Sequence, residues 1–139
     1  MAKCNVKKYR KQKPYNADGK TNFRYTNKKS GVYIIYKNSK IVYIGFSGYN
    51  VYKTMYRHFQ NWNDSSQIRI SYKAKRKNHP YTVRVVLAPA KKAERLEKML
   101  IIKHKPKDNP DKYLKYKPTQ LDNKAIREFL GEKVESCPF

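Results

Sequence analysis

Acidic residues, cysteine, glycine and long apolar runs are all scarce in this sequence. Ten Asp and Glu oppose 33 Lys and Arg over 139 residues, which gives a formal net charge of +23. No stretch approaches the roughly 18 consecutive apolar residues of a membrane helix, so we expect no membrane partner. The scarcity of carboxylates also limits where acid chemistry can reside, because only Asp18 and Asp64 are acidic before residue 94.

The two cysteines, Cys4 and Cys137, stand at opposite ends of the sequence. They are too few and too far apart for a zinc site or a disulfide framework, so a reducing compartment is the simpler expectation. Residues 1–30 hold no apolar core, so no secretory signal is expected in them. The richness in Lys, Asn, Tyr and Ile is typical of AT-rich genomes. We therefore expect a cytoplasmic protein of a bacterial or phage-infected cell.

The large positive charge requires a polyanionic partner. Each Lys or Arg that neutralises a phosphate releases condensed counterions, which gives affinity without sequence information. An anionic membrane surface is the rival partner, but no basic amphipathic helix with a continuous apolar face is present at either end. The composition therefore predicts a nucleic-acid-binding protein.

Hydrophobic residues make up 39% of the chain and aromatic residues 14%, which is enough for one small core. Residues 1–30 predict a flexible basic arm, partly ordered through Tyr15, Phe23 and Tyr25. Residues 31–110 predict the compact domain, and 111–139 an extension with a short helix. The predicted class is α/β in the broad sense, more narrowly α+β, with an antiparallel sheet flanked by helices. The predicted strands are 31–37, 40–46, 67–72 and 81–87, and the predicted helices are 50–63, 90–104 and a last one from near Asp122 to Gly131.

Glu97 is the most informative residue. It lies four residues after Ala93 and three before Leu100, which places it on the apolar face of the 90–104 helix. A carboxylate there is costly unless a cation or several donors meet it, so a salt bridge is one explanation. A divalent metal is the other, because Mg²⁺ is often held by one or two carboxylates plus water and phosphate. His58 similarly interrupts the apolar stripe of the 50–63 helix, where it is either a hydrogen-bonded core residue or a catalyst.

Two tripeptides on neighbouring strands, together with three later polar positions, resemble the GIY-YIG nuclease family. The first tripeptide is Gly31-Val32-Tyr33, and the second, on the next strand, is Tyr43-Ile44-Gly45. The later positions are His58 on the next helix, Glu97 on the helix after that, and Asn109 shortly after Pro106, in the family's order. The resemblance covers residues 31–110.

The resemblance implies a small domain that hydrolyses nucleic-acid phosphodiesters with one divalent metal, Mg²⁺ or Mn²⁺. It implies that Glu97 holds the metal and that Tyr33 activates the attacking water. It also implies that Tyr43 and His58 orient water or phosphate, and that Asn109 supports the geometry. DNA, in double-stranded form, is the expected substrate ahead of RNA.

The two tyrosines can share one site only if the hairpin between them is not regular. A two-residue turn at Asn38-Ser39 with no irregularity pairs Tyr33 with Ile44, which leaves Tyr33 and Tyr43 on opposite faces. A three-residue loop or one bulge places them opposite each other on the same face. A regular two-residue hairpin would rule out a shared site.

One position departs from the family pattern. The family's helix carries an Arg four residues before the His, and this chain has Thr54 there. Three explanations stay open: Arg57 supplies the cation, Lys53 or a lysine of the 73–77 loop supplies it, or the enzyme is weak or inactive. The residues expected to grip the nucleic-acid backbone are Lys53, Lys73, Lys75, Arg76 and Lys77.

The hypotheses therefore number three. The first is a metal-dependent endonuclease, and the second is a GIY-YIG-like module that binds nucleic acid without cutting it. The third, a ribosomal or RNA-packaging protein, accounts for the charge but leaves Glu97 and the paired motifs unexplained.

Overall fold

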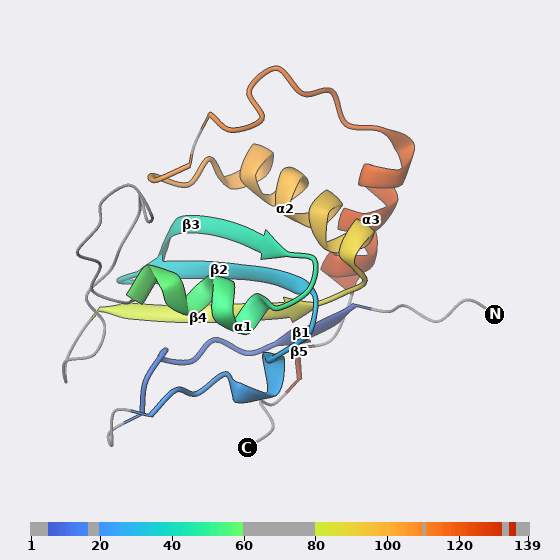
Figure 1. Ribbon diagram of the computed structural model, residues 1–139. Coiled ribbons are helices and arrows are strands. Elements are labelled where there is room, and N and C mark those ends of the chain that lie inside the picture. Colours follow the sequence, from blue (N-terminus) through green and yellow to red (C-terminus); the bar gives the residue numbers. More distant parts are fainter. Residues whose placement is uncertain (1–5, 17–19, 60–79, 110, 132–133, 136–139) are drawn as a thin grey trace.

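The structure is a computed structural model, and it describes residues 6–16, 20–59, 80–109, 111–131 and 134–135 (Figure 1). Its strands are β1 (Lys7–Tyr9), β2 (Gly31–Lys37), β3 (Lys40–Ser47), β4 (Tyr81–Leu87) and β5 (Val134–Glu135). Its helices are α1 (Val51–Tyr56), α2 (Ala90–His104) and α3 (Gln120–Gly131), with 3₁₀ turns η1 (Arg24–Thr26) and η2 (Arg57–Phe59). The chain is of the α+β class, as the sequence predicts.

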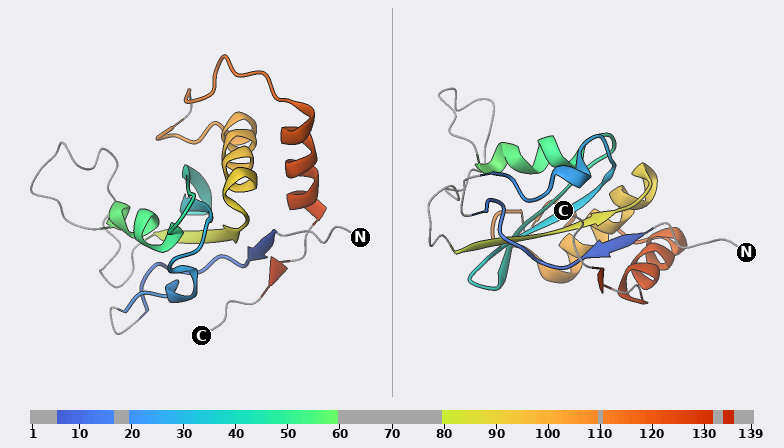
Figure 2. Two further views of the ribbon diagram at one scale, coloured as in Figure 1. Left: turned by 45° about the vertical axis from the view of Figure 1, so that its right-hand side comes forward. Right: turned by 90° about the horizontal axis from the view of Figure 1, so that it is seen from below.

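One five-stranded sheet in the order β3-β2-β4-β1-β5 organises the molecule. The first four strands run antiparallel to their neighbours, and β5 pairs parallel to β1. Helix α1 covers one face of the sheet, and α2 with α3 covers the other (Figure 2). Because both faces of β2 are covered, its first five residues are all buried, and two separate hydrophobic clusters form on the two sides.

The helix from 90 to 104 and the strand from 81 to 87 agree with the prediction residue for residue. The last helix begins earlier than Asp122. Thr119 and Asp122 cap it reciprocally: the Asp122 N–H donates to Thr119 Oγ1 at 3.2 Å, and the Thr119 N–H donates to Asp122 Oδ2 at 2.9 Å. Asp122 is therefore the third residue of α3, and Thr119 is its N-cap.

The basic N-terminal segment is part of the fold, in contrast to the expected flexible arm. Its residue Val6 and the aromatic residue Phe23 are fully buried, and Tyr15 is buried as well. β1 pairs with β4, and the Lys8 ammonium donates to the carbonyl of Phe129 at 3.0 Å near the end of α3. A cation at a helix C-terminus is favourable, because the last carbonyls carry partial negative charge. Strands as short as β1 and β5 have no pattern of their own, which is why the sequence predicted neither.

The predicted strand at 67–72 and the basic loop after it lie outside the described residues. So do the last positions of the predicted 50–63 helix, whose described part is α1 followed by η2. Among the helices that the structure describes, none has both the length and the apolarity that crossing a bilayer requires.

Candidate active site

A bulge in β3 brings the two motif tyrosines to the same face of the sheet. The turn at Asn38-Ser39 has two residues, both with positive φ, as a tight hairpin turn requires. The register then shifts, because Tyr36 pairs with Ile41 but Ile35 pairs with Tyr43. The extra residue is in β3, so Tyr33 pairs with Gly45 and not with Tyr43 itself.

Tyr33 and Tyr43 are therefore diagonal neighbours. Their rings stack with centroids 6.0 Å apart and an interplanar angle of 22°. A shared face needed a bulge or a longer loop, and the bulge is present. The expectation that the two tyrosines lie directly opposite each other is wrong, because the extra residue is in β3 and moves the partner of Tyr33 from Ile44 to Gly45, two positions from Tyr43.

The motif glycines are needed because other groups occupy the space of their side chains. A Cβ on Gly45 would lie 2.3 Å from the Tyr33 hydroxyl oxygen, so the tyrosine ring lies across this glycine. A Cβ on Gly31 would lie 2.4 Å from the carbonyl oxygen of Val86 on the neighbouring strand. Gly45 thus admits the Tyr33 ring, and Gly31 permits close approach of two backbones.

His58 completes a cluster with the two tyrosines. Its Nε2 lies 2.9 Å from the Tyr33 hydroxyl oxygen, and its ring centroid lies 4.5 Å from that of Tyr43. The half-buried Tyr43 therefore stacks on Tyr33, which is 2% exposed and whose hydroxyl is hydrogen-bonded to the buried His58.

The pKa of Tyr43 is also affected by the charges of Glu97 and Lys112. Burial raises the pKa of Tyr43 above its usual range, the Lys112 ammonium and the hydrogen bond from Tyr33 lower it, and the Glu97 carboxylate raises it. The net pKa is raised, so Tyr43 is a neutral phenol at neutral pH. A tyrosine that acts as a base at neutral pH needs a lowered pKa, and Tyr43 does not meet that requirement on its own.

Glu97 is buried on the inner face of α2, as predicted, and is 1% exposed. Both of its carboxylate oxygens accept a hydrogen bond. The Lys112 ammonium donates to Oε2 at 2.9 Å, and the Tyr113 hydroxyl donates to Oε1 at 2.5 Å. Burial and the bond to the carboxylate raise the pKa of Tyr113, which keeps its proton on the phenol. The salt bridge that the sequence left as one of two explanations for Glu97 is therefore present.

Lys112 and Tyr113 are site residues that were not predicted from the sequence. Both lie in the segment after α2, which has no periodicity and was predicted as irregular. The sequence did contain a usable signal. A buried carboxylate needs a cation or several donors, and the segment after α2 is rich in lysine. The Lys112 side chain is 46% exposed, so its ammonium lies at the boundary between the carboxylate and solvent.

Asn109 covers the free edge of the sheet. Its side-chain amide donates to the carbonyl of Ile44 at 2.5 Å, and the neighbouring Asp108 N–H donates to the carbonyl of Val42 at 2.9 Å. Both acceptors belong to β3, the edge strand. Asn109 thus fixes β3 against the segment that carries Lys112, while its own Oδ1 is buried with no partner among the described residues.

The position where the family has its arginine holds no cation. The Thr54 hydroxyl donates to the carbonyl of Asn50 at 3.1 Å within the same helix. Lys53 and Arg57 are both exposed on the same short helical stretch. The lysines and arginine at 73–77 lie outside the described residues. Lys112 is a described cation that acts on the cluster, because its ammonium lowers the pKa of Tyr43.

A single carboxylate is the donor set available for a divalent metal at Glu97. Among the described residues, no group of three or more His, Cys, Asp or Glu gathers in one place. One carboxylate is enough for Mg²⁺ when water and substrate phosphate supply the other ligands. The Lys112 ammonium already occupies a cation position at Oε2, and its exposure lets it leave for solvent, so the residues fit a metal bound in exchange for that lysine.

Comparison with protein-family models, curated proteins and solved structures finds no match to this chain.

Proposed function

We propose that this protein is a divalent-metal-dependent endonuclease that hydrolyses phosphodiester bonds of nucleic acid, with double-stranded DNA as the substrate. The observation that carries the proposal is the position of Tyr43. Its ring contacts the rings of Tyr33 and His58. Its pKa is affected by the charges of Glu97 on α2 and of Lys112 in the segment after α2. The groups that water activation and phosphate stabilisation require therefore meet at the edge strand β3.

Tyr43 is the tyrosine that meets the attacking water in this proposal. Tyr33 is fully buried, so its hydroxyl reaches the reaction only through a neighbour. As water attacks phosphorus, Tyr43 takes a proton from it and passes its own proton to Tyr33, which passes one to His58 Nε2. The imidazole of His58 can take up this proton through its ring nitrogen, whereas a neutral phenol cannot hold an additional proton.

In this proposal, a metal ion on Glu97 and the ammonium of Lys112 balance the negative charge of the phosphate. A Mg²⁺ or Mn²⁺ ion on Glu97 would polarise the phosphate and neutralise its developing negative charge. Lys112, released from Glu97 Oε2, can contact a non-bridging phosphate oxygen from its half-exposed position. Lys112 thereby takes the cationic role that was expected of Arg57, Lys53 or the 73–77 loop.

The experiment that tests the proposal is cleavage of supercoiled plasmid with Mg²⁺ or Mn²⁺. Wild type is compared with Glu97→Ala and with Glu94→Ala, and EDTA is the metal control. Glu94 is the matched control because it is on the same helix but half exposed, 3.6 Å from Lys98. We expect metal-dependent nicking that Glu97→Ala abolishes and Glu94→Ala preserves.

A second candidate function is a nucleic-acid-binding module without catalysis. Two observations favour it: Thr54 supplies no cation, and both Glu97 oxygens are already satisfied within the protein. It predicts tight, salt-sensitive DNA binding with no cleavage in any metal, unchanged by Glu97→Ala. That result would refute the nuclease proposal.

A further inference from the structure

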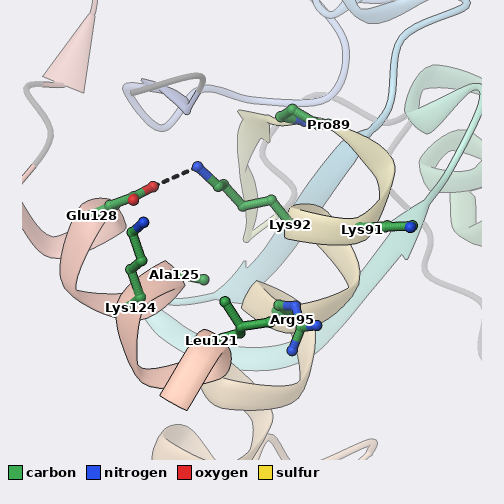
Figure 3. Close-up of a pocket in the computed structure, with 8 residues that line it drawn as sticks. All are labelled: Pro89, Lys91, Lys92, Arg95, Leu121, Lys124, Ala125 and Glu128. Atoms are coloured by element: carbon green, nitrogen blue, oxygen red, sulfur yellow. Dashed lines mark hydrogen bonds and ion pairs between the residues drawn. The ribbon is translucent and has the colours of Figure 1, made fainter. Parts of the chain in front are cut away.

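A groove between α2 and α3 is bordered by cationic side chains. Its volume is about 340 Å³, and its floor includes Ala125 (Figure 3). The charged residues that line it are Lys91, Lys92, Arg95, Lys124 and Glu128. Four cations thus surround the groove, against one carboxylate.

The basic border continues past the beginning of α2. A second hollow of about 410 Å³ is also lined by Pro89, so the two hollows border the same residue. Lys7, Lys28 and Lys29 line this second hollow. We refer to these seven cations, Lys7, Lys28, Lys29, Lys91, Lys92, Arg95 and Lys124, as the Pro89 basic surface.

Internal ion pairs use only part of this charge. Lys92 pairs with Glu128 at 2.5 Å, and Arg95 pairs with the buried Asp122 at 3.0 Å. Lys91 and Lys124 are exposed, and neither has a hydrogen bond or ion pair with another described residue. Figure 3 shows the Lys124 side chain pointing toward the Lys92–Glu128 pair. A surface with an excess of positive charge attracts polyanions.

The Pro89 basic surface contains none of the candidate catalytic residues, but three of its cations, Lys91, Lys92 and Arg95, lie on the same helix as Glu97. Glu97 is eight positions after Pro89, which is about 12 Å along the helix axis. That distance equals the rise of about three to four base pairs of duplex DNA. A duplex cleaved at Glu97 therefore brings its neighbouring phosphates within reach of this surface.

We propose that the Pro89 basic surface binds the sugar–phosphate backbone of DNA a few base pairs from the cleavage position. The inference rests on the proposed nucleic-acid function, and it adds a second contact region on the face of the molecule formed by α2 and α3. The contacts come mainly from lysine, which binds phosphate as a point charge. The surface therefore contributes affinity and not base recognition.

The test measures affinity for a duplex of about 20 base pairs in EDTA across a salt series. Wild type is compared with the triple variant Lys29→Gln, Lys91→Gln, Lys124→Gln. A matched triple variant, Lys37→Gln, Lys40→Gln, Lys103→Gln, removes the same charge from exposed lysines elsewhere. We expect the slope of log affinity against log salt to fall by about 2 to 3 in the first variant and by less than about 1 in the second.

Equal slopes for wild type and the first variant, or an equal loss in the matched variant, would overturn the inference while leaving the nuclease proposal standing. Wild type that binds but cuts in no metal would refute the nuclease and leave this surface intact. Absence of any DNA binding by wild type would refute both. An anionic membrane is the alternative partner, and binding to vesicles of phosphatidylcholine with one third phosphatidylserine tests it. If only vesicle binding is lost in the first variant, the surface is a membrane contact and the inference is wrong.

Discussion

Two carboxylates are buried among the residues that the structure describes, Glu97 on α2 and Asp122 on α3, and each is held by one cation and one tyrosine. Lys112 and Tyr113 hold Glu97, while Arg95 and Tyr116 hold Asp122. Asp122 in addition accepts the backbone N–H of Thr119 as part of a helix cap. Glu97 lies in the middle of its helix, and both hydrogen bonds to its carboxylate come from side chains.

This difference in hydrogen-bond partners identifies Asp122 as a structural carboxylate, whereas the burial of Glu97 needs another explanation. Asp122 takes part in the N-terminal cap of α3, and its bonds to backbone and guanidinium account for its burial. Glu97 lies at neither end of its helix, and the hydrogen bonds to its carboxylate come from side chains. An apolar residue of similar volume would fill this position at a lower cost in folding free energy. A buried charge that the fold does not need is a candidate for function.

The largest effect is expected at Glu97. Replacing it with Gln preserves the volume but removes the charge, so cleavage falls about 10³-fold or more, as is typical when transition-state charge loses its stabilisation. Stability changes little, because the half-exposed Lys112 moves to solvent. Plasmid nicking rates and thermal unfolding measure the two quantities. A strong loss of stability with intact cleavage would show that Glu97, like Asp122, has a structural role.

The reverse result is expected for Asp122→Ala. The variant loses the cap of α3 and leaves Arg95 and Tyr116 without their acceptor, which costs about 2 kcal/mol. Denaturant unfolding measures the loss, and cleavage per folded molecule stays at the wild-type value. A specific loss of cleavage in folded protein would contradict the structural role.

The effect of Asp122 also depends on pH in a defined direction. Burial raises the pKa of this carboxyl, but its hydrogen bonds to Thr119, Tyr116 and Arg95 outweigh burial and lower it to about 2. A lowered folded-state pKa gives stability that is present above the unfolded value of about 4 and is lost as pH falls toward 2. The stability difference between wild type and Asp122→Asn should therefore shrink over this interval. A difference that is constant down to pH 2 would mean that the lowered pKa is absent.

Gly45→Ala tests the α1 side of the site. The new methyl would lie 2.3 Å from the Tyr33 hydroxyl oxygen, so Tyr33 must move away from His58. We expect a loss of about 1 to 3 kcal/mol in stability and a fall in cleavage rate. Gly131→Ala is the matched control, because a Cβ there meets nothing within 4 Å. Equal behaviour of the two variants would show that Tyr33 does not depend on Gly45.

The smallest effect is expected for Lys112→Met. This variant leaves the buried Glu97 carboxylate with the Tyr113 hydroxyl as its described donor, so some stability is lost in the absence of metal. Mg²⁺ should then raise the unfolding temperature more in Lys112→Met than in wild type, because the lysine no longer competes for Glu97. Lys115→Met, an exposed neighbour, is the control. The same Mg²⁺ response in all three proteins would argue against a metal on Glu97.

The sequence predicted the elements whose residues repeat at a regular spacing. The 90–104 helix, the 81–87 strand and the burial of Glu97 all follow from apolar periodicity, and the structure has each of them. The hairpin was predicted, but the length of its turn was left open, and the bulge after Ile35 has no sequence signal of its own. The sequence alone therefore could not decide whether the two tyrosines share a face, because that depends on the register.

The contacts that the sequence could not predict all come from irregular or very short segments. Lys112 and Tyr113 come after α2 in a stretch without periodicity, and β1 is a three-residue lysine-rich strand. Lysine is usually solvated, so nothing in the sequence marks Lys8 as a residue whose ammonium is buried against Phe129. Tertiary packing decides such segments, whereas propensity and pattern do not.

The parallel pairing of β1 with β5 constrains the order in which the protein is built. Lys8 pairs with Val134, and β1 pairs with β4 on its other side. The β2–β3 hairpin closes over a few residues, and β4 can join it as soon as it is synthesised. The pairing with β5 must wait until nearly the whole described chain has been made, and contacts this distant in sequence are slow to form. During synthesis, the tyrosine pair is therefore expected to assemble well before the outer edge of the sheet closes.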